Sequence, residues 1–208
     1  MPPVNIHLAN LVERRPELGV CLPEIERAVG LISASYRAGG KLLLCGNGGS
    51  AADADHISGE LLKGFAHKRR ITGARRAQLG DALADQLQGS LPAIPLGAFT
   101  AASTAWANDC DSEYMYAQLV NGLGKPGDVL LGISTSGNAK NVAHAVDVAN
   151  RTGLVTIGLT GSSGGRLKNL AQACIRVPAK ETYLIQELHL SVYHCLCLLL
   201  EDVFFCET

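Results

Sequence analysis

Two short segments of the sequence carry side chains that could do acid–base or metal chemistry. In "LCGNGGSAADADHISGEL" (44–61), His56 and Glu60 lie four residues apart, which places both on one face of a helix. Asp53 lies three residues before His56, on a neighbouring face. An imidazole beside a carboxylate can transfer protons or bind a cation. The alternative interpretation is an exposed helix with ordinary polar residues.

The second segment is "YLIQELHLSVYH", in which Gln186, Glu187, His189 and His194 interrupt an apolar helical pattern. A buried polar group without a partner costs roughly 1–3 kcal/mol, so these side chains either satisfy one another or build a site. Gln186 and His194 are eight residues apart, about 12 Å along one helix. We therefore expect Gln186 at the helix entrance, or a site that assembles across subunits.

Two polar turns follow predicted strands and precede predicted helices. "CGNGGSA" (45–51) lets backbone N–H groups approach an anion at a helix N-terminus. It matches a dinucleotide-binding turn poorly, because Ala51 replaces the third glycine and no acid ends the next strand. "GISTSGNAKNV" aligns three hydroxyls, which suit a phosphate monoester or simply cap the helix. We interpret a third turn, "LTGSSGGRL" (159–167), as structural.

The elements that position these residues follow one alternating pattern. Short apolar runs predict buried strands at 41–45, 91–97, 128–134, 154–160 and 174–179. Helical patterns separate the runs, which indicates right-handed βαβ units and a doubly wound parallel sheet. Two helices are predicted before the first strand, within 3–38, and one long helix is predicted in "ETYLIQELHLSVYHCLCLLLEDVFF".

Composition favours one α/β domain over residues 1–208. The formal charge of −1 argues against a broad nucleic-acid surface. The apolar C-terminal stretch is interrupted by polar residues, so we expect a buried helix and no membrane span. Seven cysteines without a CxxC pair favour a reducing cytoplasm over a disulfide framework.

Residues 67–90 stand apart between the first two predicted strands. The segment begins with basic residues, for which we expect a solvated face. Leu79, Leu83 and Leu87 then follow at a spacing of four, which favours an amphipathic helix. We expect a helical insert after the first βα unit.

The chain resembles the sugar isomerase (SIS) domain family, and within it the sedoheptulose-7-phosphate isomerases, also called phosphoheptose isomerases. The resemblance rests on the order and spacing of "GNGGSAADADH", "NDCD", "GDVLLGISTSGN", "LTGSSGG" and "IQELHLSVYH", which together span 41–200. It implies a five-stranded, flavodoxin-like SIS fold. It also implies one zinc ion per subunit and a homotetramer with sites shared between subunits.

The resemblance further implies roles for individual residues. Glu60 and His194 match the acid/base pair. The residues that match the zinc ligands are His56, Glu60, Gln186 and His194. The candidates for substrate binding are Asn47, Gly48, Gly49, Ser50, Asp53, Glu60, Asn108, Asp109, Ser134, Thr135, Ser136 and Gln186, the three hydroxyl residues forming the phosphate clamp.

The implied reaction is the conversion of sedoheptulose 7-phosphate to D-glycero-D-manno-heptose 7-phosphate through an enediol. Such a reaction needs a base at carbon and a second acid/base group for the oxygens, which a carboxylate and an imidazole can supply. Ala139 and Tyr183 depart from the family pattern, which leaves an isomerase of another phosphosugar as an alternative. A non-catalytic SIS regulator, binding a protein such as a replication initiator, is the other.

Overall fold

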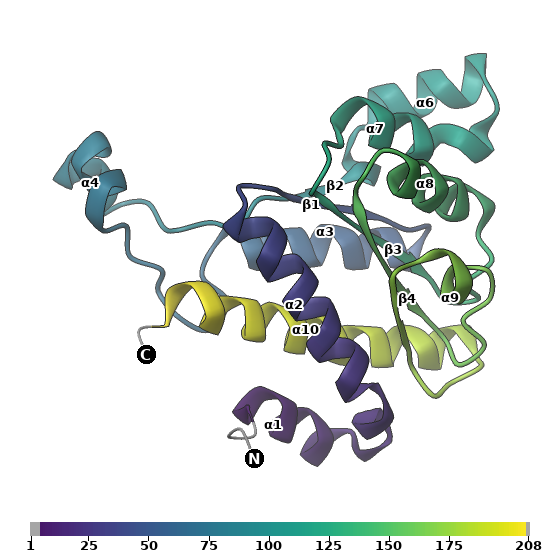
Figure 1. Ribbon diagram of the computed structural model, residues 1–208, viewed down its shortest axis with the longest axis horizontal. Coiled ribbons are helices and arrows are strands. Elements are labelled where there is room, and N and C mark those ends of the chain that lie inside the picture. Colours follow the sequence, from purple (N-terminus) through teal and green to yellow (C-terminus); the bar gives the residue numbers. More distant parts are fainter. Residues whose placement is uncertain (1–4, 207–208) are drawn as a thin grey trace.

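The computed structural model describes residues 5–206 and contains a five-stranded sheet whose strand pairings are all parallel (Figure 1). The strand order is β2-β1-β3-β4-β5. The strands are β1 (Leu42–Cys45), β2 (Ala93–Pro95), β3 (Val129–Ser134), β4 (Val155–Thr160) and β5 (Ala173–Arg176). The predicted doubly wound sheet is therefore confirmed, and each predicted apolar run overlaps one strand.

The strand order determines where polar turns can meet. β2 lies on one side of β1, whereas β3 lies on the other side. Connections therefore leave the carboxyl ends of β1 and β3 in opposite directions, and ligands of such sheets bind in the crevice between them. The two polar turns identified in the sequence follow these same two strands.

Alternation along the strands divides the core between the two faces of the sheet. Leu42 and Leu44 face one apolar cluster, and Leu43 and Cys45 face the other, as the two-residue period requires. The first face is covered by α2 (Leu22–Arg37), α3 (Gly49–Leu62) and α10 (Thr182–Phe205). The second face is covered by α7 (Met115–Leu123), α8 (Lys140–Arg151) and α9 (Leu167–Leu170).

The remaining elements lie before the sheet and around its edge. The predicted N-terminal helices are confirmed as α1 (Ile6–Arg14) and α2, with the 3-10 helix η1 (Pro16–Cys21) between them. The side chain of Asn5 caps α1 by accepting a hydrogen bond from the backbone N–H of His7. The edge elements are η2 (Leu96–Ala98), α6 (Thr100–Asp109) and η3 (Ser112–Tyr114).

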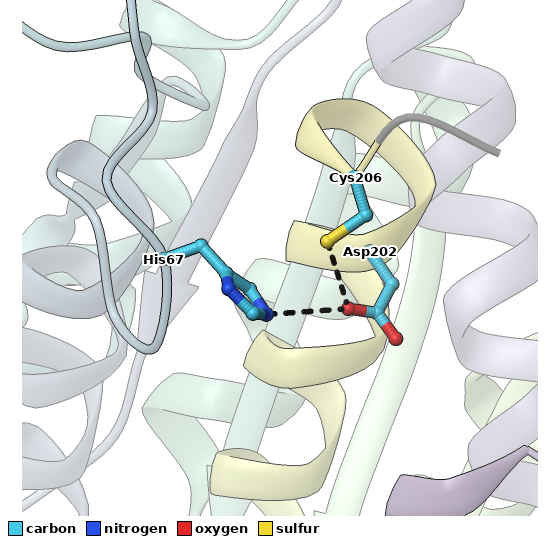
Figure 2. A group of neighbouring side chains, drawn as sticks. All are labelled: His67, Asp202 and Cys206. Carbon is cyan, nitrogen blue, oxygen red and sulfur yellow. Dashed lines mark hydrogen bonds and ion pairs between the residues drawn. The ribbon is translucent and has the colours of Figure 1, made fainter.

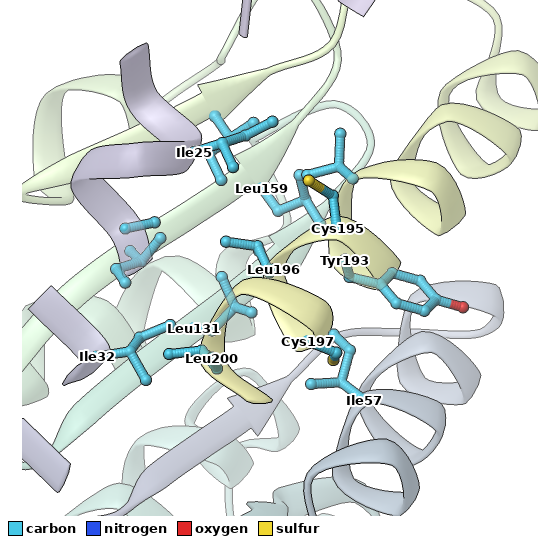
Figure 3. Close-up of a cluster of buried hydrophobic side chains, with 14 of the residues drawn as sticks. Ile25, Ile32, Ile57, Leu131, Leu159, Tyr193, Cys195, Leu196, Cys197 and Leu200 are labelled. Atoms are coloured by element: carbon cyan, nitrogen blue, oxygen red, sulfur yellow. The ribbon is translucent and has the colours of Figure 1, made fainter. Parts of the chain in front are cut away.

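The long C-terminal helix α10 lies in the centre of the first apolar cluster (Figure 3). Cys195, Leu196 and Leu200 are buried in this cluster, and the helix packs against α1, α2 and α3. By length and composition, α10 is the one helix of residues 5–206 that could cross a membrane, yet 56 % of its most apolar window is buried inside the protein. This packing agrees with the predicted buried helix.

The insert forms two short helices, α4 (Gly73–Leu79) and α5 (Asp81–Ala84), on an arm that extends from the body (Figure 1). The expected amphipathic helix through Leu79, Leu83 and Leu87 does not form. Gly80 has a φ of 76°, which ends α4 after Leu79. Leu83 and Leu87 are exposed.

Candidate active site

The centre of the candidate site is one face of α3. His56 Nε2 lies 3.1 Å from Glu60 Oε1, as their four-residue spacing predicts. The second carboxylate oxygen of Glu60 accepts a hydrogen bond from Lys63 Nζ at 3.3 Å. The Glu60 side chain is only 14 % exposed, whereas that of His56 is 42 % exposed. A partly desolvated carboxylate is therefore held between two basic groups.

Helix α10 adds His194 to this face. The His194 and His56 rings lie edge to face with centroids 5.1 Å apart, and Phe65 covers His194 at 5.4 Å. His194 Nε2 is buried and has no hydrogen-bond partner among the described residues. Burial and the neighbouring His56 lower the pKa of His194, and Glu60 opposes them only in part. The neutral imidazole therefore offers an unused polar atom beside Glu60.

Tyr193 fixes the orientation of His56 from the other side. Its hydroxyl lies 2.8 Å from His56 Nδ1, so the Nε2 atom remains directed at Glu60. Burial raises the pKa of Asp53, while hydrogen bonding to Tyr193 and the nearby His56 lower it in part. Tyr193, His56 and Glu60 thus form a continuous hydrogen-bonded series, while Asp53 Oδ2 is buried without a partner among the described residues.

The C-terminal end of α3 is held by Arg69. Its guanidinium donates hydrogen bonds to the backbone carbonyls of Leu61 at 2.6 Å and Glu60 at 3.0 Å. The same guanidinium forms a fully buried ion pair with Glu201 at 2.7 Å. These carbonyls lack helical partners, so the Arg69 contacts fix the turn that carries Glu60.

Gln186 is the one predicted zinc ligand that lies apart from the others. A Cβ atom on Gly49 would collide with the Gln186 carboxamide, so this side chain rests against the first turn of α3. His194 lies about 12 Å further along α10, next to His56. A single chain therefore brings together His56, Glu60 and His194 but not Gln186. The eight-residue spacing of Gln186 and His194 on one rigid helix predicts this separation.

The turn after β1 contacts the start of α8. Asn47 and Asn141 exchange two side-chain amide hydrogen bonds of 2.9 Å. Gly48 adopts a φ of 55°, which favours glycine, and Ser50 is buried in the first turn of α3. The predicted substrate loop, 47–50, thus lies at the crevice between β1 and β3.

The turn after β3 borders a cavity of about 280 Å³. Thr135 and Ser136 line it, whereas Ser134 is buried and accepts a long hydrogen bond of 3.5 Å from the Ala139 N–H. The third polar turn contributes Ser162 and Ser163 to the same cavity, so it is part of this pocket. Other lining residues are Asn138, Gly161, Ala179, Lys180, Thr182 and Ile185.

Asn108 and Asp109 do not join these groups within the chain. They lie at the end of α6, where Asn108 Nδ2 donates a hydrogen bond to Asp109 Oδ1 at 2.8 Å. Both are exposed, and α6 buries none of its residues. Their predicted contact with a sugar therefore remains a prediction that a single chain does not fulfil.

With this geometry in view, comparison with known proteins defines the class. The sequence model of the SIS domain family matches residues 22–161. The chain therefore belongs to the SIS domain family, and the predicted membership is confirmed.

The relatives of this chain define the branch. The phosphoheptose isomerase of Rhodospirillum rubrum is 41 % identical over 185 residues, which cover 89 % of this chain and 88 % of the relative. That of Nitratiruptor is 46 % identical over 164 residues, covering 79 % and 78 %. The structure of a phosphoheptose isomerase from Francisella tularensis superposes with a TM-score of 0.77 at 32 % identity, covering 91 % of both chains. The resemblance to the phosphoheptose isomerase branch is thereby confirmed.

Several residues of this region were not predicted from the sequence. Tyr193 and Phe65 are ordinary apolar residues in the sequence, and only packing brings them to His56 and His194. Neither the residue type nor the spacing of Asn141 and Lys180 in the sequence indicates a role in the site. Ser163 could have been identified, because its turn resembles the one that contains Ser136.

Proposed function

We propose that the protein is a phosphosugar aldose–ketose isomerase that converts sedoheptulose 7-phosphate to D-glycero-D-manno-heptose 7-phosphate. The phosphoheptose isomerase relatives support the substrate class, and the side chains of the site support the reaction. The observation on which the proposal depends is the contact of the Glu60 carboxylate with His56, whose ring packs against the buried, unpartnered His194.

Two separate regions of the site suit the two ends of the proposed substrate. Thr135, Ser136 and Lys180 border the cavity that would receive the phosphate, while His194 lies further along α10, close to His56 on α3. Ile185 lines that cavity and Gln186 reaches the first turn of α3, so the start of α10 lies between the two ends. A long sugar, with its phosphate and carbonyl at opposite ends, suits this arrangement.

In the reaction, Glu60 removes the proton from C1 of the open-chain ketose and delivers it to C2 after the enediol has formed. His194 donates a proton to O2 and accepts one from O1, since its imidazole is neutral. Tyr193 holds His56, which in turn contacts Glu60. Each transfer needs its group within hydrogen-bond reach of the substrate.

Zinc is the proposed cofactor, one ion per subunit. His56, Glu60 and His194 offer nitrogen and oxygen donors of the kind that zinc prefers, and the unpartnered His194 Nε2 fits such a ligand, which would leave Nδ1 of His194 for the proton transfers. Gln186 fits only after a rearrangement or in an assembly. A bound zinc ion would polarise the substrate carbonyl.

We further propose a cytoplasmic homotetramer of single-domain subunits. Helix α6 supports the proposal, because it carries the exposed pair Asn108 and Asp109 and buries none of its residues in one chain. A second copy that covers α6 would bring this pair to a shared site.

Turnover of sedoheptulose 7-phosphate by the purified protein tests the proposal. Glu60→Gln keeps the size of the side chain and removes the base, so we expect turnover to fall by at least about a hundredfold with substrate binding retained. Glu26→Gln, an exposed change on α2, is the control and should turn over normally. Native turnover by Glu60→Gln would refute the assignment.

A further inference from the structure

A second group of ligand-type side chains lies at the far end of α10, away from Glu60. His67, Asp202 and Cys206 place one nitrogen, one oxygen and one sulfur atom within 4.8 Å of one another. No other group of three His, Cys, Asp or Glu ligand atoms in residues 5–206 is that close. Figure 2 shows His67 reaching from the loop after α3 toward the last turn of α10.

The distances among the three ligand atoms suit a tetrahedral metal ion. Two of these distances are measured from one carboxylate oxygen, Asp202 Oδ1. Cys206 Sγ lies 3.3 Å from Asp202 Oδ1, and His67 Nε2 lies 4.0 Å from the same oxygen. Ligand atoms around a zinc ion are separated by roughly 3.3–3.6 Å, given bonds of about 2.0–2.3 Å. A shift of a few tenths of an ångström in the exposed His67 side chain would complete this geometry.

The surrounding structure holds these ligands in position. His7 Nε2 lies 2.9 Å from the other Asp202 oxygen, Oδ2, and so orients the carboxylate. The backbone N–H of His67 donates to the buried Glu201 carboxylate at 3.2 Å, which fixes the loop. Hydrogen bonds that orient ligands in this way are typical of metal sites.

From this geometry we propose that His67, Asp202 and Cys206 form a zinc-binding site with His7 as its orienting residue. The mixed nitrogen, oxygen and sulfur set favours zinc over magnesium or calcium, which prefer oxygen alone. A fourth position stays open to water. The ion would join the base of the insert arm to α1 and α10, independently of the proposed isomerase function.

Cobalt titration of the full-length, reduced, metal-free protein tests this site. A thiolate bound to Co²⁺ gives a charge-transfer band in the near ultraviolet, and the residues proposed for the active site include no cysteine. We expect this band at one equivalent per chain in the wild type and its loss in Cys206→Ser. Cys110→Ser removes the other exposed cysteine and should keep the band.

Zinc competition against the cobalt signal then measures the contribution of His67. We expect His67→Ala to weaken Zn²⁺ binding by more than about tenfold, and His144→Ala to leave it unchanged. Absence of the band in the wild type would overturn the proposal. So would a band that persists in Cys206→Ser, or unchanged affinity in His67→Ala.

Discussion

Two regions of α10 differ in whether their buried polar groups have hydrogen-bond partners. Near the C-terminal end, the fully buried Glu201 carboxylate accepts hydrogen bonds from the backbone N–H groups of Phe65 and Ala66 at 2.8 Å and from Arg69 at 2.7 Å. Towards the middle of the helix, His194 Nε2 and both ring nitrogens of His189 are buried without hydrogen-bond partners among residues 5–206.

This difference distinguishes a structural anchor, Glu201, from a functional site at the unpartnered histidines. Burial raises the pKa of Glu201, but the donors from Phe65, Ala66 and Arg69 lower it more, so the carboxylate stays ionised and binds the loop after α3 to α10. The unpartnered histidines cost stability, since each buried polar atom lost its water. Such a cost is tolerated where the atoms serve a ligand or a reaction.

The largest expected effect is on turnover, at the unpartnered histidine in the middle of α10. His194→Leu should reduce turnover of sedoheptulose 7-phosphate by at least about a hundredfold, because the second acid/base group is lost. The same change should leave thermal stability unchanged or raised, since it removes a buried unpartnered nitrogen. Steady-state kinetics and a thermal melt measure both. A strong loss of stability would show that His194 is an anchor like Glu201.

At the satisfied end, stability should fall instead. Glu201→Gln leaves the Arg69 charge buried without its partner, which should cost about 3–5 kcal/mol in the free energy of unfolding. Urea denaturation measures the loss. In a double-mutant cycle, adding Arg69→Met should recover part of it. If the two single changes were simply additive, the pair would not be the anchor.

His189 should make stability depend on pH. Burial lowers its pKa to about 4, below the value of about 6.5 in unfolded chains. The unfolded state therefore binds a proton first, so stability is complete above about pH 6.5 and declines toward pH 4, by up to about 3 kcal/mol. His189→Leu should remove this part of the decline. The urea unfolding midpoints of the wild type and of His189→Leu are to be measured at pH 7 and pH 5. Identical pH dependence of the two midpoints would contradict the assignment of the decline to His189.

The smallest expected effects distinguish two glycines of α3. Gly49→Ala should displace Gln186 and raise KM roughly fivefold, the equivalent of one lost hydrogen bond of about 1 kcal/mol. Gly59→Ala meets nothing within 4 Å and should stabilise the helix by about 0.5–1 kcal/mol without changing KM. Equal KM values in both variants would show that Gln186 does not contribute to substrate binding.

The sequence alone determined the local features of this protein. Short apolar runs predicted the strands, because a buried parallel strand needs apolar residues on both faces. The glycine and serine turns predicted the ends of β1 and β3. The spacing of His56 and Glu60 predicted their contact, because residues four apart on a helix are neighbours by geometry.

Only the tertiary structure decided which distant groups became partners. Arg69 and Glu201 are 132 positions apart, and nothing in either local pattern indicates their pairing. Tyr193 meets His56 because α10 packs against α3, whereas the same helix holds Gln186 apart from His194. His67 likewise meets Asp202 and Cys206 only where the loop crosses α10. Periodicity describes how one element presents its faces, and the choice of partner follows from how the core packs.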